Sequence, residues 1–176
     1  MKTALLVTFA VLTETAFATI GHHRTFHQLP ARQSQSASEQ TAAQKNPVQF
    51  VLDHYLEIES ALANDSMQGV ASNASAIGRA TGGYSMKMLS PEIAAQADIL
   101  AETKTLGAAR AVFKRLSKSL ILYIAQHNST STYVQVYCPT TKASWLQKSD
   151  KIKNPYMGGS MRSCGTIQKK IKEKTG

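Results

Sequence analysis

Residues 136–165 hold most of the residue types in this chain that could bind a soft metal or form a crosslink. Both cysteines, Cys138 and Cys164, lie there with the only tryptophan, Trp145, and two of the six methionines, one of them Met161. Thiolate and thioether sulfur are the ligands that Cu(I) and Ag(I) prefer. The residue types therefore suggest a metal site made of Cys138, Met161 and Cys164, although the C-x-x-C spacing that would be strong support is absent.

A disulfide between Cys138 and Cys164 is the competing interpretation, because an even number of cysteines in an oxidising compartment pairs by default. Closing this loop would stabilise the fold by about 3–4 kcal/mol in the chain-entropy view. It would pin an irregular loop to the rest of the domain, with Trp145 and Tyr156 packed beneath it. Both interpretations require the two Cα atoms to lie about 4.4–6.8 Å apart. The residues alone leave both open.

Three further methionines could add sulfur to a metal site: Met157, Met86 and Met88. Methionine also fills irregular gaps in protein cores, so these side chains have an ordinary structural explanation.

Residues 1–18 are typical of a signal peptide. Lys2 precedes an apolar run over residues 4–12, and residues 16–18 read Ala-Phe-Ala, a small-residue cleavage signature. The run is too short to cross a bilayer, and no later segment is more apolar. We therefore expect a periplasmic or secreted protein with no membrane span, whose mature form begins at Thr19.

Residues 19–45 are rich in Ser, Gln, Ala and Thr and lack apolar periodicity, which predicts a flexible linker. His22, His23 and His27 lie in this linker. They could capture a metal ion, or they could be scattered polar residues, and the sequence does not decide between the two.

Four helices are expected between residues 46 and 127. Asn46 before Pro47 and Ser90 before Pro91 are typical helix starts, since Asn and Ser cap a helix and Pro fits its first turn. Asp65 or Ser66 could cap the second helix, which should end at the glycine pair 82–83. The strongest apolar stripe lies in the last helix: Leu106, Phe113, Leu116, Leu120, Tyr123 and Ile124. The pattern predicts a mostly α fold, an up-and-down four-helix bundle.

The C-terminal part is predicted to cap this bundle. Residues 133–137 alternate as a short strand, residues 138–165 lose periodicity, and residues 166–173 could form a short basic helix. The residues expected to shape the irregular cap loop are Trp145, Asn154, Pro155, Tyr156 and Gly158. The predicted organisation is a signal peptide (1–18), a flexible linker (19–45), a helical bundle domain with its cysteine-containing cap (46–168) and a basic tail (169–176).

The chain carries a formal net charge of +9, concentrated near the C-terminus, where residues 142–174 hold eight lysines and one arginine against two acidic residues. This excess could attract acidic partners, or it could be a solvated basic surface. No aromatic and basic recognition pattern accompanies it, so nucleic acid is not expected as a partner. No nucleophile motif, phosphate loop or metal-hydrolase spacing is present either, and the chain is not expected to be an enzyme.

The order of residues in the C-terminal part resembles the signature of a bacterial exported domain family of unknown function. The similar positions are Tyr137-Cys138-Pro139, Trp145-Leu146, Asn154-Pro155-Tyr156, Gly158, Met161 and Cys164-Gly165. Residues 51–65 and 109–121 resemble helices of the same family, so the resemblance covers nearly all of residues 46–168. Members of that family occur free-standing, or attached to or encoded beside periplasmic adaptor proteins of copper and silver efflux pumps.

The resemblance implies an exported accessory domain that binds Cu(I) or Ag(I) near Cys138, Met161 and Cys164 in heavy-metal efflux or tolerance. Its implied partner is the periplasmic adaptor of such a system. This chain departs from the family at Thr140, where a methionine is usual, and a ligand could be missing there. The alternative function is a metal-free structural or protein-interaction module without a cofactor, in which the Cys138–Cys164 disulfide is purely structural.

Overall fold

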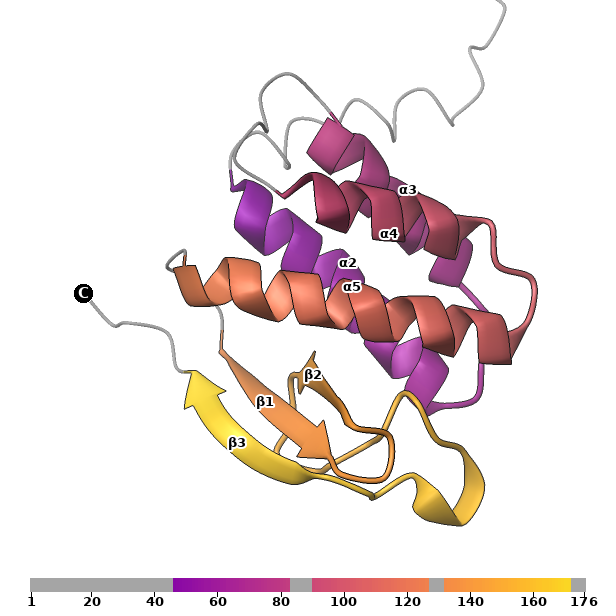
Figure 1. Cartoon of the computed structure of the whole chain (residues 1–176), viewed down its shortest axis with the longest axis vertical. Coiled ribbons are helices and arrows are strands. Elements are labelled where there is room, and N and C mark those ends of the chain that lie inside the picture. Colours follow the sequence, from indigo (N-terminus) through magenta and orange to yellow (C-terminus); the bar gives the residue numbers. More distant parts are fainter. Residues whose placement is uncertain (1–45, 83–89, 127–131, 172–176) are drawn as a thin grey trace, which may run out of the picture. The chain divides into compact units, whose positions relative to one another are not determined.

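The computed structural model describes residues 46–82, 90–126 and 132–171. The predicted signal peptide and linker lie outside these residues, as do His22, His23, His27, Met86 and Met88. The described part is mostly helical, with four helices followed by a small three-stranded antiparallel sheet (Figure 1). The helices are α2 (Pro47–Ala63), α3 (Val70–Gly82), α4 (Pro91–Ala101) and α5 (Leu106–Gln126).

The predicted starts of α2 and α4 are confirmed. The side chain of Asn46 accepts a hydrogen bond from the backbone N–H of Gln49 at 3.1 Å, and that of Ser90 accepts one from Glu92 at 3.3 Å. A proline follows each cap, where its missing N–H costs nothing.

The predicted start of the second helix is wrong, because α3 begins at Val70 rather than directly after Asp65 or Ser66. Asp65 has a positive φ of 57°, and the Ser66 hydroxyl accepts the N–H of Gln68 at 3.0 Å within a turn. A left-handed residue cannot continue a right-handed helix, so the chain turns here before α3 starts.

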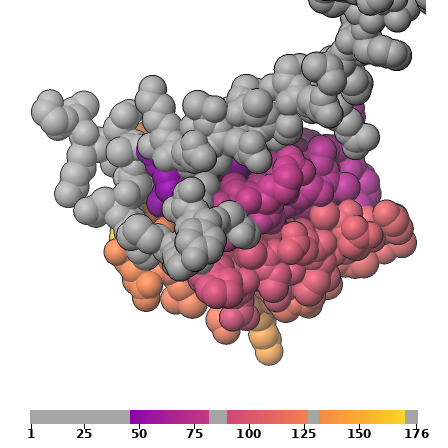
Figure 2. Space-filling view, turned by 90° about the horizontal axis from the view of Figure 1, so that it is seen from above, coloured from indigo at the N-terminus to yellow at the C-terminus, as the bar shows by residue number. Residues whose placement is uncertain are grey.

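Neighbouring helices pack on one another around a common apolar core, with α3 against both α2 and α4, and α4 against α5. The stripe predicted for α5 faces this core, and Phe113, Leu116 and Leu120 are fully buried. Figure 2 shows α3, α4 and α5 side by side, with the sheet largely out of sight. No helix among residues 46–82 and 90–126 has the length and apolar character needed to cross a membrane.

The C-terminal part contains more regular structure than predicted. The strands are β1 (Tyr133–Cys138), β2 (Ala143–Gln147) and β3 (Thr166–Ile171), in the order β2-β1-β3. The expected strand over 133–137 is confirmed as part of β1. The segment expected to be wholly irregular contains β2, and the expected basic helix over 166–173 is the strand β3, which extends past residue 168.

The sheet has a helix-facing side and a side covered by the loop between β2 and β3. It packs against α5 and α2 through β2, on the side of α5 away from α3 and α4 (Figure 1). Tyr133 and Leu146 join the helical core, while Val136 and Trp145, which are paired across β1 and β2, form a second small core with Cys138. Both sides of β2 are therefore buried, which removes the apolar and polar alternation that marks a half-exposed strand.

Candidate functional site

A disulfide joins the end of β1 to the segment before β3. Cys138 and Cys164 form this bond with their Cα atoms 5.8 Å apart, within the usual range for a disulfide. Cys138 is fully buried and Cys164 is partly exposed. The disulfide closes a ring that contains β2 and the whole loop after it, and we call residues 148–165 the cap loop.

Asn154 is the centre of the cap loop and is fully buried. Its side-chain amide donates to the carbonyl of Cys164 at 2.8 Å and its side-chain oxygen accepts the N–H of Tyr156 at 2.8 Å. Its backbone N–H donates to the carbonyl of Arg162 at 2.6 Å. One residue therefore ties both ends of the loop together beside the disulfide, and Pro155 directly after it fixes the turn.

A buried hydroxyl network joins the cap loop to the helices. Ser117 Oγ on α5 lies 2.8 Å from the hydroxyl of Tyr55 on α2 and 2.9 Å from the hydroxyl of Tyr156. The Tyr156 hydroxyl also reaches the carbonyl of Ser144, and the Tyr55 hydroxyl accepts the N–H of Leu146, both on β2. Burial raises the pKa of both tyrosines well above the usual value, so the phenols stay neutral.

Trp145 lies in the strand β2 rather than in the irregular loop, and it packs in the small core that contains Cys138. It is fully buried, meets the Tyr156 ring edge-on at 5.8 Å, and donates its indole N–H to Gln147 at 3.0 Å. Gly165 is required beside it, because its φ is 153° and a Cβ atom there would come within 2.8 Å of both Trp145 and Val136.

An ion cluster holds the tip of the cap loop to the turn after α2. The carboxylate of Asp65 binds Arg110 of α5 and Arg162 of the loop, each at 2.6 Å. Arg110 also donates to the carbonyls of Pro155 at 2.8 Å and Leu62 at 2.9 Å. The hydrogen bonds from the two arginines hold the pKa of Asp65 below its usual value.

Gly158 lets the loop approach this ion cluster closely, since a Cβ atom at this position would collide with the Asp65 carboxylate. The sequence pattern identified Gly158 as a residue of the cap loop. It did not indicate that Asp65, Arg110 and Arg162 would form an ion cluster beside it.

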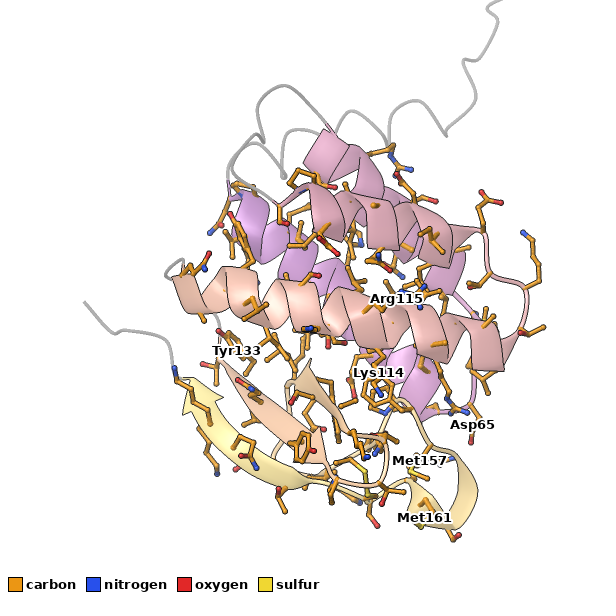
Figure 3. The ribbon with its side chains drawn as sticks, in the orientation of Figure 1. Asp65, Lys114, Arg115, Tyr133, Met157 and Met161 are labelled. Carbon is orange, nitrogen blue, oxygen red and sulfur yellow. A yellow bond between two sulfur atoms is a disulfide. The ribbon has the colours of Figure 1, made fainter. Side chains whose placement is uncertain are left out.

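The two methionines of the cap loop differ in their surroundings. Met157 packs against the small core that contains Cys138, whereas Met161 is 40% exposed. The carbonyl of Met161 accepts the N–H of Cys164 at 3.0 Å. Figure 3 shows both methionines at the tip of the cap loop, and Met161 is the last residue of the short helical turn Gly159–Met161 there.

The nitrogen and oxygen ligands for a metal are not grouped in the described part of the chain. No cluster of three or more His, Cys, Asp or Glu side chains suited to a metal ion occurs there. The imidazole of His54 binds Asn73 at 2.7 Å and meets the Phe50 ring edge-on at 4.4 Å. The metal role of Cys138, Met161 and Cys164 stays a prediction, because the clusters of His, Cys, Asp and Glu considered above do not include the thioether sulfur of methionine.

Glu59 is a buried acid that sequence reasoning did not single out. It is 6% exposed and its Oε1 has no hydrogen-bond partner. It lines a hollow of about 390 Å³ between α2 and the start of the cap loop, together with Gln147 and Lys153. Burial raises the pKa of Glu59 to about 8, and the nearby ammonium of Lys153 reduces this shift. The sequence did contain a signal that Glu59 is buried, because Glu59 lies on the same face of the helix as Leu52 and Leu56, which are both buried.

Removing the disulfide should destabilise the protein. We expect the double variant Cys138→Ala and Cys164→Ala to lose about 3 kcal/mol of unfolding free energy, mainly because the unfolded chain is no longer restrained. Urea unfolding with and without a reducing agent measures this loss. The reducing agent should destabilise the wild type and leave the double variant unchanged. Equal stability of the oxidised and reduced wild type would contradict a structural role.

A DUF3347 domain, described as a protein of unknown function, is found over residues 51–132. The match covers most of α2 and all of α3, α4 and α5, and it ends before β1, so the sheet and both cysteines lie outside it. No curated protein and no solved structure matches the chain.

Proposed function

We propose that this protein is an exported accessory module that binds a partner protein and performs no catalysis, with the Cys138–Cys164 disulfide as a structural crosslink. One observation carries this proposal: Met161 is 40% exposed, and the loop that holds it is fixed at its base. Binding surfaces are commonly loops positioned by a rigid scaffold.

The anchoring of the cap loop supports a recognition role. The disulfide and Asn154 hold its base, and the Asp65 cluster holds its tip, so little conformational entropy remains to be lost on binding. An exposed methionine adapts to an apolar partner surface because its side chain is flexible and polarisable. We propose that residues 159–163, most of which are exposed, form the contact surface.

The proposal extends to location, architecture and partner. The signal-like residues 1–18 support export, and an oxidising compartment is where a disulfide persists. We further propose that the four helices form a single up-and-down bundle that carries the cap. The partner implied by the family resemblance is the periplasmic adaptor of a copper or silver efflux system.

A photo-crosslinking experiment tests the proposed surface. A photoreactive amino acid replaces Met161 in the full chain produced in its source cells, and a matched variant carries it at Ile99, which is 48% exposed. The proposal predicts a discrete heterologous product from position 161 that is absent from the control. Identical products from both positions, or none from position 161, would refute this surface.

Soft-metal binding by the reduced protein is a second candidate function, favoured by the packing of Met157 on the core that contains Cys138. The two thiols and this thioether would supply three soft ligands for Cu(I) or Ag(I). Titration of reduced protein with Cu(I) under a competing chelator tests this role, with Met157→Leu and Met161→Leu as matched variants. Equal uptake by both variants and the wild type would remove both thioethers from the site, and no uptake would leave the interaction module alone.

A further inference from the structure

A groove lies between α5 and the helix-facing side of the sheet. Its volume is about 520 Å³, within the range of about 300–1,000 Å³ that is usual for small-molecule sites. One wall is α5, and the other comes from β1, the turn after it and the start of β2. The groove is separate from the contact surface proposed above, which lies on residues 159–163.

The groove is mainly apolar. The apolar side chains that α5 contributes to the lining are Ala111, Ile121 and Leu122, and Leu122 is 57% exposed. Tyr137 of β1 and Ala143 of β2 complete the apolar lining. A strongly exposed leucine beside a hollow leaves apolar surface in water that a bound acyl chain or ring would cover.

Every ionisable lining side chain apart from the tyrosine is cationic. The side-chain ammonium groups of Lys118 and Lys142 have no hydrogen-bond or ion-pair partner within residues 46–82, 90–126 and 132–171. Lys114 donates to the carbonyl of Thr141 at 2.6 Å, which ties α5 to the turn and leaves two ammonium protons for another acceptor.

The fourth cationic side chain of the lining is that of Arg115, and it is hydrogen-bonded to a neighbouring helix. Arg115 donates to Gln96 on α4 at 2.8 Å, and Figure 3 shows it on the other side of α5 from Lys114. Glu92 lines the adjoining hollow near Arg115 and Lys118 but forms no ion pair among the described residues. Three ammonium groups therefore border an apolar groove whose lining contains no carboxylate.

We propose that this groove binds an amphiphilic carboxylate, with its acyl chain or ring along Leu122 and Tyr137 and its carboxylate at Lys118 and Lys142. An anionic head satisfies the two unpartnered ammonium groups through charge-assisted hydrogen bonds. A fully apolar ligand would leave the lysines unused. The bond from Lys114 to Thr141 holds the two walls together, so the site is formed before binding.

The probe is decanoate below its micelle concentration, titrated into the oxidised protein and followed by ¹H–¹⁵N NMR. We expect saturable shifts concentrated at the groove residues, including Leu122 and Tyr137. Decanol should bind at least about tenfold more weakly, and decylammonium should not bind, because they lack the carboxylate that the lysines recognise.

Two groove variants and one control complete the test. The double variant Lys118→Glu and Lys142→Glu should weaken decanoate binding by at least about tenfold, and Leu122→Gln should weaken it severalfold. The control Lys151→Glu and Lys169→Glu makes the same change of charge at two exposed lysines outside the groove, and should bind normally. Circular dichroism verifies that each variant is folded, and Leu122→Gln keeps the test decisive because its side chain is already exposed.

Equal decanoate binding by the groove double variant and its control would overturn the proposal, as would equal binding of decylammonium or the absence of saturable shifts. If an acidic amphipathic peptide bound in the groove and decanoate did not, the site would be a protein-docking groove and the small-molecule proposal would be wrong. Crosslinking from position 161 is independent of all these outcomes.

Discussion

The unfolding free energy of this protein should fall as the pH rises from 4.5 through about 8, and the variant Glu59→Gln should show much less of this fall. The carboxyl of Glu59 is buried, which raises its pKa from 4.5 to about 8 in the folded protein. Between these values the folded state holds a proton that the unfolded state has lost. The stabilisation is therefore complete below pH 4.5 and is lost as the pH rises through about 8.

The expected size of this effect is large. A shift of this extent corresponds to about 4–5 kcal/mol between the two ends of the pH range, at about 1.4 kcal/mol per pKa unit. A small domain has only about 5–15 kcal/mol of stability in total. Glutamine keeps the shape of a protonated glutamate and cannot ionise, so Glu59→Gln should be the more stable form at high pH.

Urea unfolding at a series of pH values measures this difference. The matched control is Glu57→Gln on the same helix, whose side chain is exposed and forms a long ion pair with Lys148 at 3.8 Å. The control should keep the pH dependence of the wild type. Parallel curves for the wild type and Glu59→Gln would show that Glu59 does not titrate in this range.

The second large effect is expected for Phe113→Ala, which should lose about 3–5 kcal/mol of unfolding free energy. Phe113 is fully buried, stacks on Tyr55 at 4.8 Å and approaches Tyr156 at 6.0 Å. Its removal leaves a cavity at the meeting point of α2, α5 and the cap loop. The surrounding rings are held by the hydroxyl network on Ser117 and can collapse only partly into the space.

Two variants calibrate this measurement. Phe113→Leu keeps most of the volume and should cost about 1–1.5 kcal/mol, while Leu122→Ala at an exposed position of the same helix should stay within about 0.5 kcal/mol of the wild type. Thermal and urea unfolding provide the values. If Phe113→Ala lost less than about 1 kcal/mol of unfolding free energy, the surrounding side chains would tolerate the cavity. Phe113 would then not be needed to hold the cap loop to the helices.

The helices were predictable from the sequence because their determinants are local. Asn46 and Ser90 cap helices within their own first turn, and the stripe around Phe113 repeats with the helical period. The start of α3 was missed because the conformation of Asp65 accompanies pairing with arginines far along the chain.

The sheet was only partly predictable. β2 is buried on both sides, and β3 reads TIQKKI, so neither shows the alternation that identified β1. Their partners are also set by contacts between distant residues, which spacing alone does not reveal. The same limit explains why the cap residues Asn154 and Tyr156 were identified but their partners on α5 and β2 were not.

The basic strand β3 lies at one side of the sheet, paired only with β1 among the described residues. A strand in this position offers unpaired backbone groups to which another copy of the chain could add a strand, and this is a common route to aggregation. If the β3 strands of two copies paired, Lys169 and Lys170 would place like charges close together and oppose the pairing. Lys170 also binds Asp150 at 2.5 Å within the chain. We therefore expect part of the lysine excess to protect the sheet from edge-to-edge association, so that replacing these lysines with neutral residues should lower solubility before it changes the fold.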